Sequence, residues 1–570
     1  MVLRRRIGYS RRGYGNESRR GLRFLILALV IAGIGYFSYR KFIQINLVKA
    51  NEALAVDNLD EARTYFQRVS GLPFSKGLGQ DGLGVIDLLH EDLESARSHF
   101  KIVLEKKPSG TGGDPALILE KFYTRGAYER GRIYRDFLLS WKEADQLSDY
   151  YLLFSALSLG NRNIREARSY LDKTPQKLKE TPRFAKLSEL IHHYEKEDEI
   201  PVWVDRNGNP ILNYQVTEES YAFDSPKLFA GWGDPNGEAS PIADLSTDER
   251  LSLIKSTLDL NLQKAAFQAM KGYNGTMVML QPDTGEVLAA YGSEGLDPLT
   301  TTFEPGSVIK VLTYGIFLEE DGDVTPFAPK NYPGNMKIGG RLFYDWTTQG
   351  DLNSVEEGMA VSCNLMFAQM GIELGWPELS KGFSLLFDDR EVPNMLKRAT
   401  PGRVSHDPEN AYELGRIAIG LDSLETTVLG LVKIPAAVAN GGKIPTPQML
   451  DSFANLEGQI YREIESSDVT SAFSAATAEK LQASMEAALQ EPRGTARRAR
   501  VDFVKAAMKT GTAGDRPFNS IMVGMFPLNN PKVVFAFYLH KGGKCEINGA
   551  RVAKSLQEQI RALAPAYLEN

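Results

Sequence analysis

An uncharged run of sixteen residues lies close to the N-terminus, between Arg23 and Arg40. Its sequence, FLILALVIAGIGYFSY, is slightly shorter than the ~17 to 25 residues of a spanning helix, but arginines at both ends can extend toward the headgroups and its tyrosines suit an interface. The YRKFIQINLVKA stretch that follows offers no small-residue cleavage site, which disfavours a cleaved signal peptide. The sequence therefore predicts an uncleaved transmembrane anchor over residues 24–39.

Charge is unevenly placed around this run. Residues 1–41 contain nine arginines, Lys41 and a single acid, Glu17, which gives a net charge of +9. Because the whole chain carries −6, the remainder carries −15. The positive-inside tendency places the basic tail, residues 1–23, in the cytoplasm and everything after residue 41 on the other side of the membrane. The acidic main body argues against nucleic acid as a partner.

Cysteine and histidine offer no support for metal or triad chemistry. Cys363 and Cys545 are the only cysteines, and one pair does not make a disulfide framework. The six histidines show no metal-ligand spacing with cysteine or acidic residues, and none lies beside the motifs described below. We therefore predict no metal, no cofactor and no Ser/His/Asp triad.

Two segments after the anchor align at a fixed offset of 34 residues: DNLDEARTYFQRV, from residue 57, and EDLESARSHFKIV, from residue 91. The offset is the tetratricopeptide period, in which a small residue lets paired helices approach and an aromatic residue fills the groove. The small and aromatic positions coincide in the two copies: Ala62 with Ala96, and Phe66 with Phe100. Two weaker copies of the repeat follow, and each has a small residue at the same position: Gly131 in YERGRIY and Ala167 in IREARSYL. The pattern predicts a tetratricopeptide-like all-α domain over residues 45–198, with an ordinary helical bundle as the alternative.

The sequence texture changes after residue 198. Residues 199–249 contain two short apolar stretches around an Asn-Gly turn and then a loop rich in glycine, proline and aspartate, which is typical of a linker or pedestal. Residues 250–566 mix strand and helix patterns, including one hairpin over 276–292, a second over 521–539, and a closing helix from about Asn548. Helices at both ends with a mainly antiparallel sheet between them predict an α+β layered domain.

The stretch FEPGSVIKVL places a lysine where a buried helix would carry an apolar residue. Ser307 follows a Pro-Gly turn and is a natural N-cap, but Lys310 has the wrong charge for a helix N-terminus. A lysine in apolar surroundings at such a place loses proton affinity and can act as a base on a hydroxyl one turn away. The spacing alone is not specific, because Ser-x-x-Lys also begins at Ser38, Ser98 and Ser252.

Two further short sequences lie in the same block. In GMAVSCNLMFAQMG, the side chains of Ser362 and Asn364 interrupt an apolar helical pattern. The second sequence is AAMKTGTAGD, just before the second predicted hairpin, which contains Lys509, Thr510, Gly511 and Thr512. Either sequence is ambiguous by itself, because the first could cap a helix and the second could be an exposed strand end.

Together, and in this order, the three motifs resemble the transpeptidase domain of penicillin-binding proteins. The resemblance covers roughly residues 250–566 and includes LDLNLQKAA, QPDTGEVLA, IAIGLDSLETT, AVANGGKIPTP, RGTARRA and VGMFPLNNPK, with DRNGNPIL as an entry segment. It implies a penicillin-binding transpeptidase/β-lactamase-like layered fold, an antiparallel sheet flanked by helices. It also implies a bacterial cytoplasmic (inner) membrane protein whose catalytic domain lies on the periplasmic, extracytoplasmic side.

The resemblance also implies roles for the first two motifs. Ser307 is the nucleophile that attacks an amide carbonyl to make an acyl-enzyme, and Lys310 is its base. Ser362 relays a proton between the lysine and the leaving nitrogen. Asn364 holds the peptide amide of the substrate.

For the third motif, Lys509 adds positive potential for a terminal carboxylate, which the hydroxyls of Thr510 and Thr512 bind. Gly511 leaves room for a peptide to lie beside the strand. The backbone amides of Ser307 and Thr512 form the oxyanion hole.

The substrate implied by the resemblance is the D-Ala-D-Ala end of a peptidoglycan stem peptide, and β-lactam antibiotics are implied as inhibitors. Two positions depart from the family pattern: Met508 replaces a glycine, and Ile521 replaces an aromatic residue. A class A β-lactamase is disfavoured, because no Glu-x-x-Leu-Asn sequence lies between Asn364 and Lys509. A D,D-carboxypeptidase or another serine acyl hydrolase of the same fold remains open, as does a penicillin-responsive sensor or scaffold.

No glycosyltransferase motif is recognised in residues 45–198. A cross-linking enzyme without its own polymerase needs glycan made nearby, so a glycan polymerase or another envelope protein is expected to bind these residues. The alternative is that they form a rigid spacer.

Overall fold

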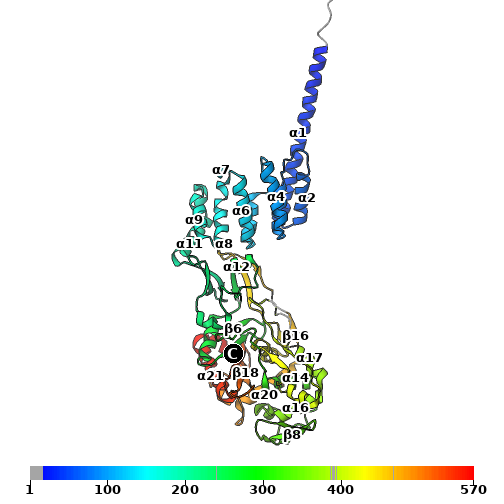
Figure 1. Ribbon diagram of the computed structural model, residues 1–570, viewed down its shortest axis with the longest axis vertical. Helices are drawn as coiled ribbons and strands as arrows, with labels where there is room; N and C mark the ends of the chain where they lie inside the picture. The colour runs from blue at the N-terminus through cyan, green and yellow to red at the C-terminus, as the bar shows by residue number, and fades with distance from the viewer. Residues whose placement is uncertain are drawn as a thin grey trace, which may run out of the picture. The chain divides into compact units, whose positions relative to one another are not determined.

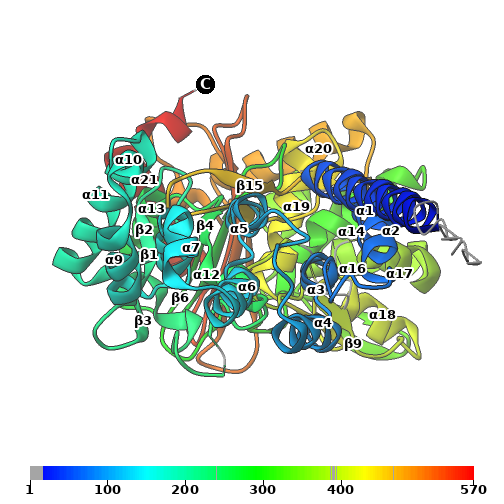
Figure 2. The same cartoon turned by 90° about the horizontal axis from the view of Figure 1, so that it is seen from above.

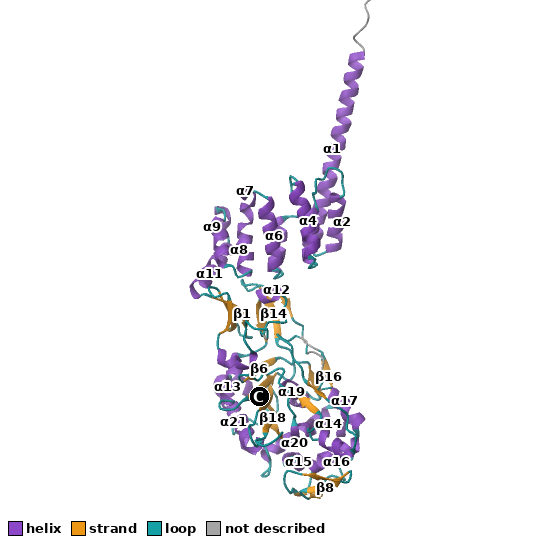
Figure 3. Cartoon of the chain, in the orientation of Figure 1, coloured by secondary structure: helices purple, strands orange, loops and turns teal. Residues whose placement is uncertain are grey.

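The computed structural model describes residues 17–569, except 239, 386, 388–391, 393 and 466–467. The chain divides into two compact units, Met1–Ser188 and Glu189–Asn570. Within the described residues, the first unit consists of helices and their connections, and the strands belong to the second (Figure 1, Figure 3). Of the predicted basic tail, residues 1–16 lie outside the described residues.

Helix α1 (Glu17–Ala55) contains the predicted anchor and continues beyond it. Its stretch Leu22–Ala55 is long and apolar enough to cross a membrane, and its most apolar window has a mean hydropathy of 1.9 with none of that window buried in the protein. The C-terminal end of the same helix packs against α2 (Leu59–Ser70) through buried Ala50 and Leu54. One unbroken helix therefore runs from the candidate span into the helical unit.

The rest of the first unit is a series of antiparallel helices (Figure 1). They are α3 (Gln80–Leu89), α4 (Leu93–Lys106), α5 (Pro115–Thr124), α6 (Tyr128–Trp141), α7 (Ala144–Leu147), α8 (Tyr151–Gly160), α9 (Ile164–Lys173), α10 (Gln176–Lys179) and the first part of α11 (Pro182–Glu197), which continues into the second unit.

The same turn recurs before four of these helices. In each turn a residue with φ between +60° and +68° is followed by the N-cap residue: Asp57 and Asn58, Glu91 and Asp92, Gly126 and Ala127, Arg162 and Asn163. The N-cap positions are separated by 34, 35 and 36 residues in turn. The helix pair thus repeats with a lengthening period, while the tetratricopeptide-like assignment itself stays a prediction.

Aromatic rings fill the spaces beside small residues in this unit. Phe66 and Phe100 are buried, as are the alanines four positions before them. A Cβ atom at Gly82 would lie 2.5 Å from the ring of Phe66, and one at Gly84 would lie 2.6 Å from the ring of Phe100. The glycines of α3 therefore let the rings of α2 and α4 pack directly on its backbone.

Replacing Phe66 by alanine is expected to destabilise the helical unit by about 3–5 kcal/mol, because it leaves a cavity that the α3 backbone cannot fill. The change is measured by urea titration of the full chain, read by proteolytic cleavage within residues 45–198. Phe74→Ala is the matched control, because Phe74 is 91% exposed. Equal midpoints for the two variants would contradict this packing.

The central sheet of the second unit has the strand order β17-β18-β19-β5-β6, with every neighbouring pair antiparallel. Its strands are β5 (Gly275–Leu280), β6 (Val287–Gly292), β17 (Ala507–Ala513), β18 (Asn519–Phe526) and β19 (Val533–Leu539). Both predicted hairpins are confirmed, as β5–β6 and β18–β19. The closing helix is α21 (Ala550–Leu563), preceded by one π-helical turn, Cys545–Gly549.

Alternate residues of each strand face different helices. Met277 and Met279 pack in one cluster with α21 and α13 (Leu260–Ala269). Val278 and Leu280 pack in the other cluster, with α19 (Val428–Ala439), so the sheet is covered by helices on both faces (Figure 2). This arrangement confirms the predicted α+β layered domain.

A second, mainly antiparallel sheet has the order β15-β14-β4-β1-β2-β3. Its strands are β1 (Glu199–Val204), β2 (Pro210–Gln215), β3 (Ser220–Phe223), β4 (Leu253–Ser256), β14 (Leu450–Ala454) and β15 (Ile460–Glu463). Three strands thus come from residues 199–249, which the sequence suggested as a linker or pedestal. They form one sheet with strands from the following block.

The remaining elements complete the second unit. The helices are α12 (Thr247–Leu251), α14 (Lys310–Glu319), α15 (Val355–Ala360), α16 (Asn364–Leu374), α17 (Trp376–Ser384), α18 (Ala411–Ile417) and α20 (Ala475–Gln490). Short strand pairs are β7 (Lys330–Tyr332) with β10 (Gly350–Leu352), β8 (Asn335–Ile338) with β9 (Arg341–Tyr344), β11 (Gly402–Val404) with β12 (Leu424–Thr426), and β13 (Lys443–Pro445) with β16 (Val469–Ser471).

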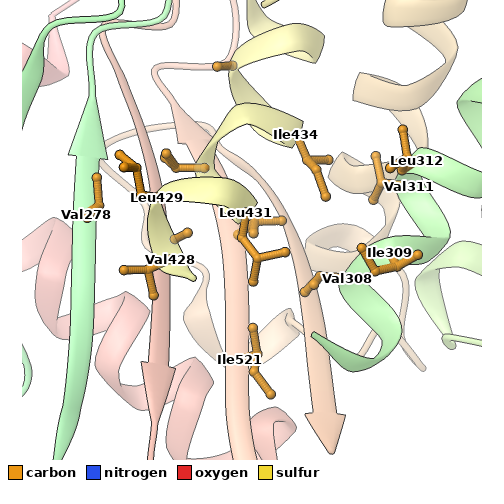
Figure 4. Close-up of a cluster of buried hydrophobic side chains, with 14 of the residues drawn as sticks. Val278, Val308, Ile309, Val311, Leu312, Val428, Leu429, Leu431, Ile434 and Ile521 are labelled. Carbon is orange, nitrogen blue, oxygen red and sulfur yellow. The ribbon is translucent and has the colours of Figure 1, made fainter. Parts of the chain in front are cut away.

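A buried apolar cluster lies between α14, α19 and the central sheet. Val308 and Ile309, which precede α14, are fully buried there together with Leu431 of α19 and Ile521 of β18 (Figure 4). This packing fixes the start of α14 against the sheet. It therefore positions the residues on either side of Val308 and Ile309, which are Ser307 and Lys310.

Candidate active site

Ser307 lies in a 3-10 turn (Gly306–Ile309) that leads directly into α14. The N-cap position of this turn is Pro305, and the turn has no side-chain cap. The expectation that Ser307 caps the helix is therefore wrong, because the helical turn begins one residue before it. Ser307 instead lines a cavity of about 700 Å³, together with Ser362, Asn364 and Thr510.

Lys310 begins α14 and is completely buried. Its Nζ donates to the carbonyl oxygen of Ser362 at 2.8 Å, to Ser362 Oγ at 3.2 Å and to Asn364 Oδ1 at 2.6 Å. Burial lowers the pKa of Lys310 to about 8, and the nearby Asp345 carboxylate opposes that shift. The first two sequence motifs thus meet at this amine.

The hydroxyl of Ser362 lies between two lysines. Lys509, also completely buried, donates from Nζ to Ser362 Oγ at 2.9 Å and to the Thr510 carbonyl at 2.8 Å. Burial, and then the charge of Lys310, hold the pKa of Lys509 well below its usual value. The two lysines therefore disfavour being positively charged at the same time. Ser362 Oγ connects their two Nζ atoms.

Ser362 has a left-handed backbone conformation, with φ of +58°. Such a conformation is uncommon for a residue with a side chain and is held by its surroundings. It turns the chain between α15 and α16 so that both the carbonyl and the hydroxyl of Ser362 reach Lys310. The N-cap of α16 is Cys363, which accepts from the Met366 amide, so capping does not explain Ser362 or Asn364.

Residues Lys509 to Thr512 form part of β17, at the edge of the central sheet. Thr510 Oγ1 donates to Thr495 Oγ1 at 2.8 Å, and Thr512 is exposed at the cavity. A Cβ atom at Gly511 would lie 2.8 Å from the Pro305 carbonyl oxygen. Gly511 therefore lets the turn that carries Ser307 approach the strand. Sequence reasoning missed this packing role.

A second close approach holds the same turn from its other side. The Gly306 amide donates to the Gly420 carbonyl at 2.8 Å, and the two residues have φ values of +59° and +85°. A Cβ atom at Gly420 would lie 2.1 Å from the Gly306 carbonyl oxygen. Only glycine fits this contact, and no local pattern around Gly420 indicated it in the sequence.

Asp345 supports the Ser-x-Asn segment, and sequence reasoning also missed it. Its Oδ2 accepts from the backbone amides of Asn364 at 2.9 Å and Leu365 at 3.4 Å, and from Cys363 Sγ at 3.2 Å. Burial, followed by the Asp345 charge, raises the pKa of the Cys363 thiol, so the thiol keeps the proton that it donates. Asp345 lies well before Ser362 and Asn364 in the sequence, and no local pattern predicts its contact with them.

The two departures from the family pattern are core residues. Met508 is buried in the cluster that contains α21, and Ile521 is buried below the Ser307 turn and pairs with Gly511. Both cysteines are free and buried. Among the described residues, no group of three or more histidine, cysteine or acidic side chains is arranged to hold a metal ion.

A serine at the start of a helix, a buried lysine one turn later, a serine between two lysines and a Lys-Thr-Gly strand edge define a serine-lysine acyltransferase site. A family model described as the penicillin-binding protein transpeptidase domain matches residues 275–561, which is half of the chain. The chain belongs to this family. The predicted resemblance to the penicillin-binding protein transpeptidase domain is thereby confirmed.

Curated relatives agree with this family. A probable peptidoglycan D,D-transpeptidase PbpC from Pseudomonas aeruginosa is 23% identical and is matched over 58% of this chain and 61% of its own length. The peptidoglycan D,D-transpeptidase PbpA from Mycolicibacterium smegmatis is 25% identical, over 53% of this chain and 70% of its own. The chain thus spans less than two thirds of the first of these relatives.

Solved structures share the fold at lower sequence identity. Penicillin-binding protein A from Mycobacterium tuberculosis has a TM-score of 0.56 at 20% identity, covering 64% of this chain and 99% of that one. The D,D-transpeptidase domain from Eggerthella lenta has a TM-score of 0.55 at 22% identity, covering 64% of this chain and 98% of that one. The predicted penicillin-binding transpeptidase fold is confirmed by these matches.

Proposed function

We propose that this chain is a membrane-anchored D,D-transpeptidase that cross-links peptidoglycan stem peptides through an acyl-enzyme on Ser307. The observation that carries the proposal is the contact of Lys310, Ser362 and Lys509 at one hydroxyl, beside the cavity that Ser307 lines. Such a chain of amines and a hydroxyl can move a proton from a nucleophile to a leaving group. It does so without a histidine.

In the first half-reaction, Ser307 Oγ attacks the carbonyl carbon of the penultimate D-Ala while neutral Lys310 accepts the hydroxyl proton. The proton passes by way of Ser362 Oγ to the nitrogen of the terminal D-Ala, the C–N bond breaks and D-Ala leaves. An ester to Ser307 remains. In the second half-reaction, an amine of a neighbouring stem attacks that ester and gives its proton to the same base. The ester C–O bond then breaks, the base returns the proton to Ser307 Oγ, and the new amide is the cross-link.

The remaining motif residues bind and polarise the donor. The backbone amides of Ser307 and Thr512 stabilise the oxyanion, and the Asn364 amide holds the donor peptide. The hydroxyls of Thr510 and Thr512 bind the terminal carboxylate, with Lys509 adding positive potential whenever it is protonated. A peptide lying along the open edge of β17 extends the sheet by one strand.

The acylation rate is expected to rise as pH increases through about 8 and to level off above it, because only neutral Lys310 accepts the Ser307 proton. At pH 7 about one tenth of such a group is neutral. Rates of labelled penicillin attachment between pH 6 and 9.5 test this. A rate that is flat or falls across that range would remove Lys310 as the base.

Labelled penicillin is expected to attach covalently at Ser307. Digestion of the labelled protein and mass spectrometry of its peptides identify the site. An adduct on the peptide that contains FEPGSVIK supports the assignment, and an adduct on any other serine overturns it.

The placement in the membrane is part of the proposal. An anchor at 24–39 with the basic tail in the cytoplasm puts the catalytic unit on the periplasmic side, where stem peptides are cross-linked. The candidate span in α1 supports the anchor. Adding membrane-impermeant penicillin to intact spheroplasts tests the orientation: labelling supports it, and labelling only after lysis contradicts it.

The helical unit is proposed to bind a glycan polymerase or another envelope protein. Its repeated helix pairs form the kind of array whose surface binds peptide or protein segments. Replacing residues 45–198 by an unrelated helical spacer of equal length separates binding from spacing. Loss of pull-down partners and reduced cross-linking in cells would support binding of a partner by residues 45–198. Unchanged partners and unchanged cross-linking would mean that these residues act only as a spacer.

A further inference from the structure

Phe74 is the most exposed large apolar side chain among the described residues, at 91%. It lies in the loop between α2 and α3, and its backbone is left-handed, with φ of +67°. Lys76, two residues on, is also left-handed, with φ of +52°. A loop that holds a large apolar residue outward at the cost of backbone strain indicates an interaction rather than packing.

The position of this loop along α1 is fixed by a contact. The Tyr39 hydroxyl donates to the carbonyl oxygen of Pro73, the residue before Phe74. Tyr39 is also the last residue of the uncharged run that precedes Arg40. Phe74 therefore lies at the level where the predicted anchor, residues 24–39, ends.

The shortness of that run places its end at the membrane boundary. Sixteen helical residues extend about 24 Å at 1.5 Å each, which is less than the ~30 Å hydrocarbon core of a bilayer. A short run draws its flanking residues toward the core. Tyr39 and the loop bonded to it then lie in the interfacial zone, where aromatic residues are favoured.

The residues around the α2–α3 loop have side chains of the kinds that suit a membrane interface. A groove of about 1970 Å³ lies between α1 and the loops beside it, and both aromatic and basic residues line it. Those relevant here are Tyr36, Tyr39, Arg40, Lys41, Phe74 and Lys76. Apolar rings with cations beside them suit the boundary between acyl chains and phosphate groups.

We propose that the α2–α3 loop is a second membrane contact, in which Phe74 enters the bilayer interface beside α1 and lipid fills the adjacent groove. The first helices of the unit then rest on the membrane surface instead of hanging from a single span. Two contacts restrict tilting of α1 relative to the bilayer. This inference rests on the proposed membrane anchor and not on the catalytic proposal.

Site-directed spin labelling of the full chain in lipid nanodiscs tests the contact. Because Cys363 and Cys545 are buried, a nitroxide can be directed to Phe74→Cys. The matched control is Val56→Cys, which is 76% exposed and follows α1 about 25 Å further along its axis from Tyr39. Collision rates with oxygen, which partitions into lipid, and with an aqueous nickel chelate report the depth of each label.

The label at position 74 is expected to show an oxygen-to-nickel collision ratio several-fold above that at position 56, with a label at Lys76→Cys between them. Equal ratios at 74 and 56 would overturn the proposal. Nanodiscs of zwitterionic lipid and nanodiscs containing anionic lipid are compared. A high ratio at 74 in either composition supports the contact, and an aqueous value in both contradicts it.

Discussion

Replacing Ser307 by alanine is expected to abolish acylation by penicillin and to reduce acyl transfer by about 10⁶-fold, the size of effect seen when a serine nucleophile is removed. The reason is chemical, because alanine has no oxygen to form the ester and the two nearby lysines cannot replace it. Gel fluorescence of labelled penicillin and product release from a stem peptide measure the two effects.

Ser98→Ala is the matched control for this change. Ser98 has the same Ser-x-x-Lys spacing, but it lies exposed on α4 of the helical unit. Its variant is expected to label like the unmodified chain. Full labelling of Ser307→Ala, with a normal thermal transition, would contradict the assignment of the nucleophile.

Replacing Lys310 by arginine is expected to slow acylation by about 10²–10⁴-fold, the usual contribution of a general base. Arginine keeps the positive charge but does not lose its proton, so it cannot accept one from Ser307. The acylation rate is measured by stopped reaction with labelled penicillin, and circular dichroism checks that the buried arginine is tolerated.

Lys101→Arg is the corresponding control, because Lys101 follows Ser98 by three residues and lies exposed on α4. That variant is expected to react at the normal rate. A folded Lys310→Arg variant with a nearly normal rate would show that another group takes the proton. Lys509, which also contacts Ser362, would then be the candidate.

The sequence was sufficient to predict the central sheet and the residues that meet at the cavity. Short continuous apolar runs on either side of PDTG and LNNPK predicted both hairpins. The runs are continuous because helices cover both faces of these strands, and turn residues bound them. Ser307, Lys310, Ser362 and Lys509 were identified because their three short motifs, ambiguous singly, together and in this order resemble the transpeptidase domain of penicillin-binding proteins.

Contacts between distant segments could not be predicted from local patterns. Asp345 supports Asn364 from a loop after β9, and Gly420 approaches Gly306 across more than one hundred residues. Each contact depends on how the chain returns to the site, and a single aspartate or glycine in a loop carries no local signal of it. The expected cap role of Ser307 was wrong because the turn begins at Gly306, with Pro305 at its N-cap position.

The segment between the helical and catalytic regions shows the same limit. Residues 199–249 carry turn signals and short apolar stretches, which suggested a linker or pedestal. Strands β1, β2 and β3 pair in chain order, and β1 also pairs with β4. The sheet continues beyond β4 with β14 and β15, which come from more than two hundred residues after β3 and which no local pattern links to this segment.

A transferase and a hydrolase of this fold differ in what attacks the ester on Ser307. A D,D-carboxypeptidase would form the same acyl-enzyme on Ser307 and would be labelled by penicillin in the same way. The difference arises only when an amine or a water molecule attacks the ester. Penicillin labelling therefore cannot distinguish these activities, and the identity of the product can.

The most direct test is incubation of the full chain with a stem pentapeptide ending in D-Ala-D-Ala and an excess of an acceptor amine, followed by mass spectrometry of the products. We expect release of D-Ala and a product whose mass equals the pentapeptide minus D-Ala joined by an amide to the acceptor. Ser307→Ala should form none of it. Formation of the hydrolysed tetrapeptide alone, at every acceptor concentration, would contradict the central claim that this chain is a transpeptidase.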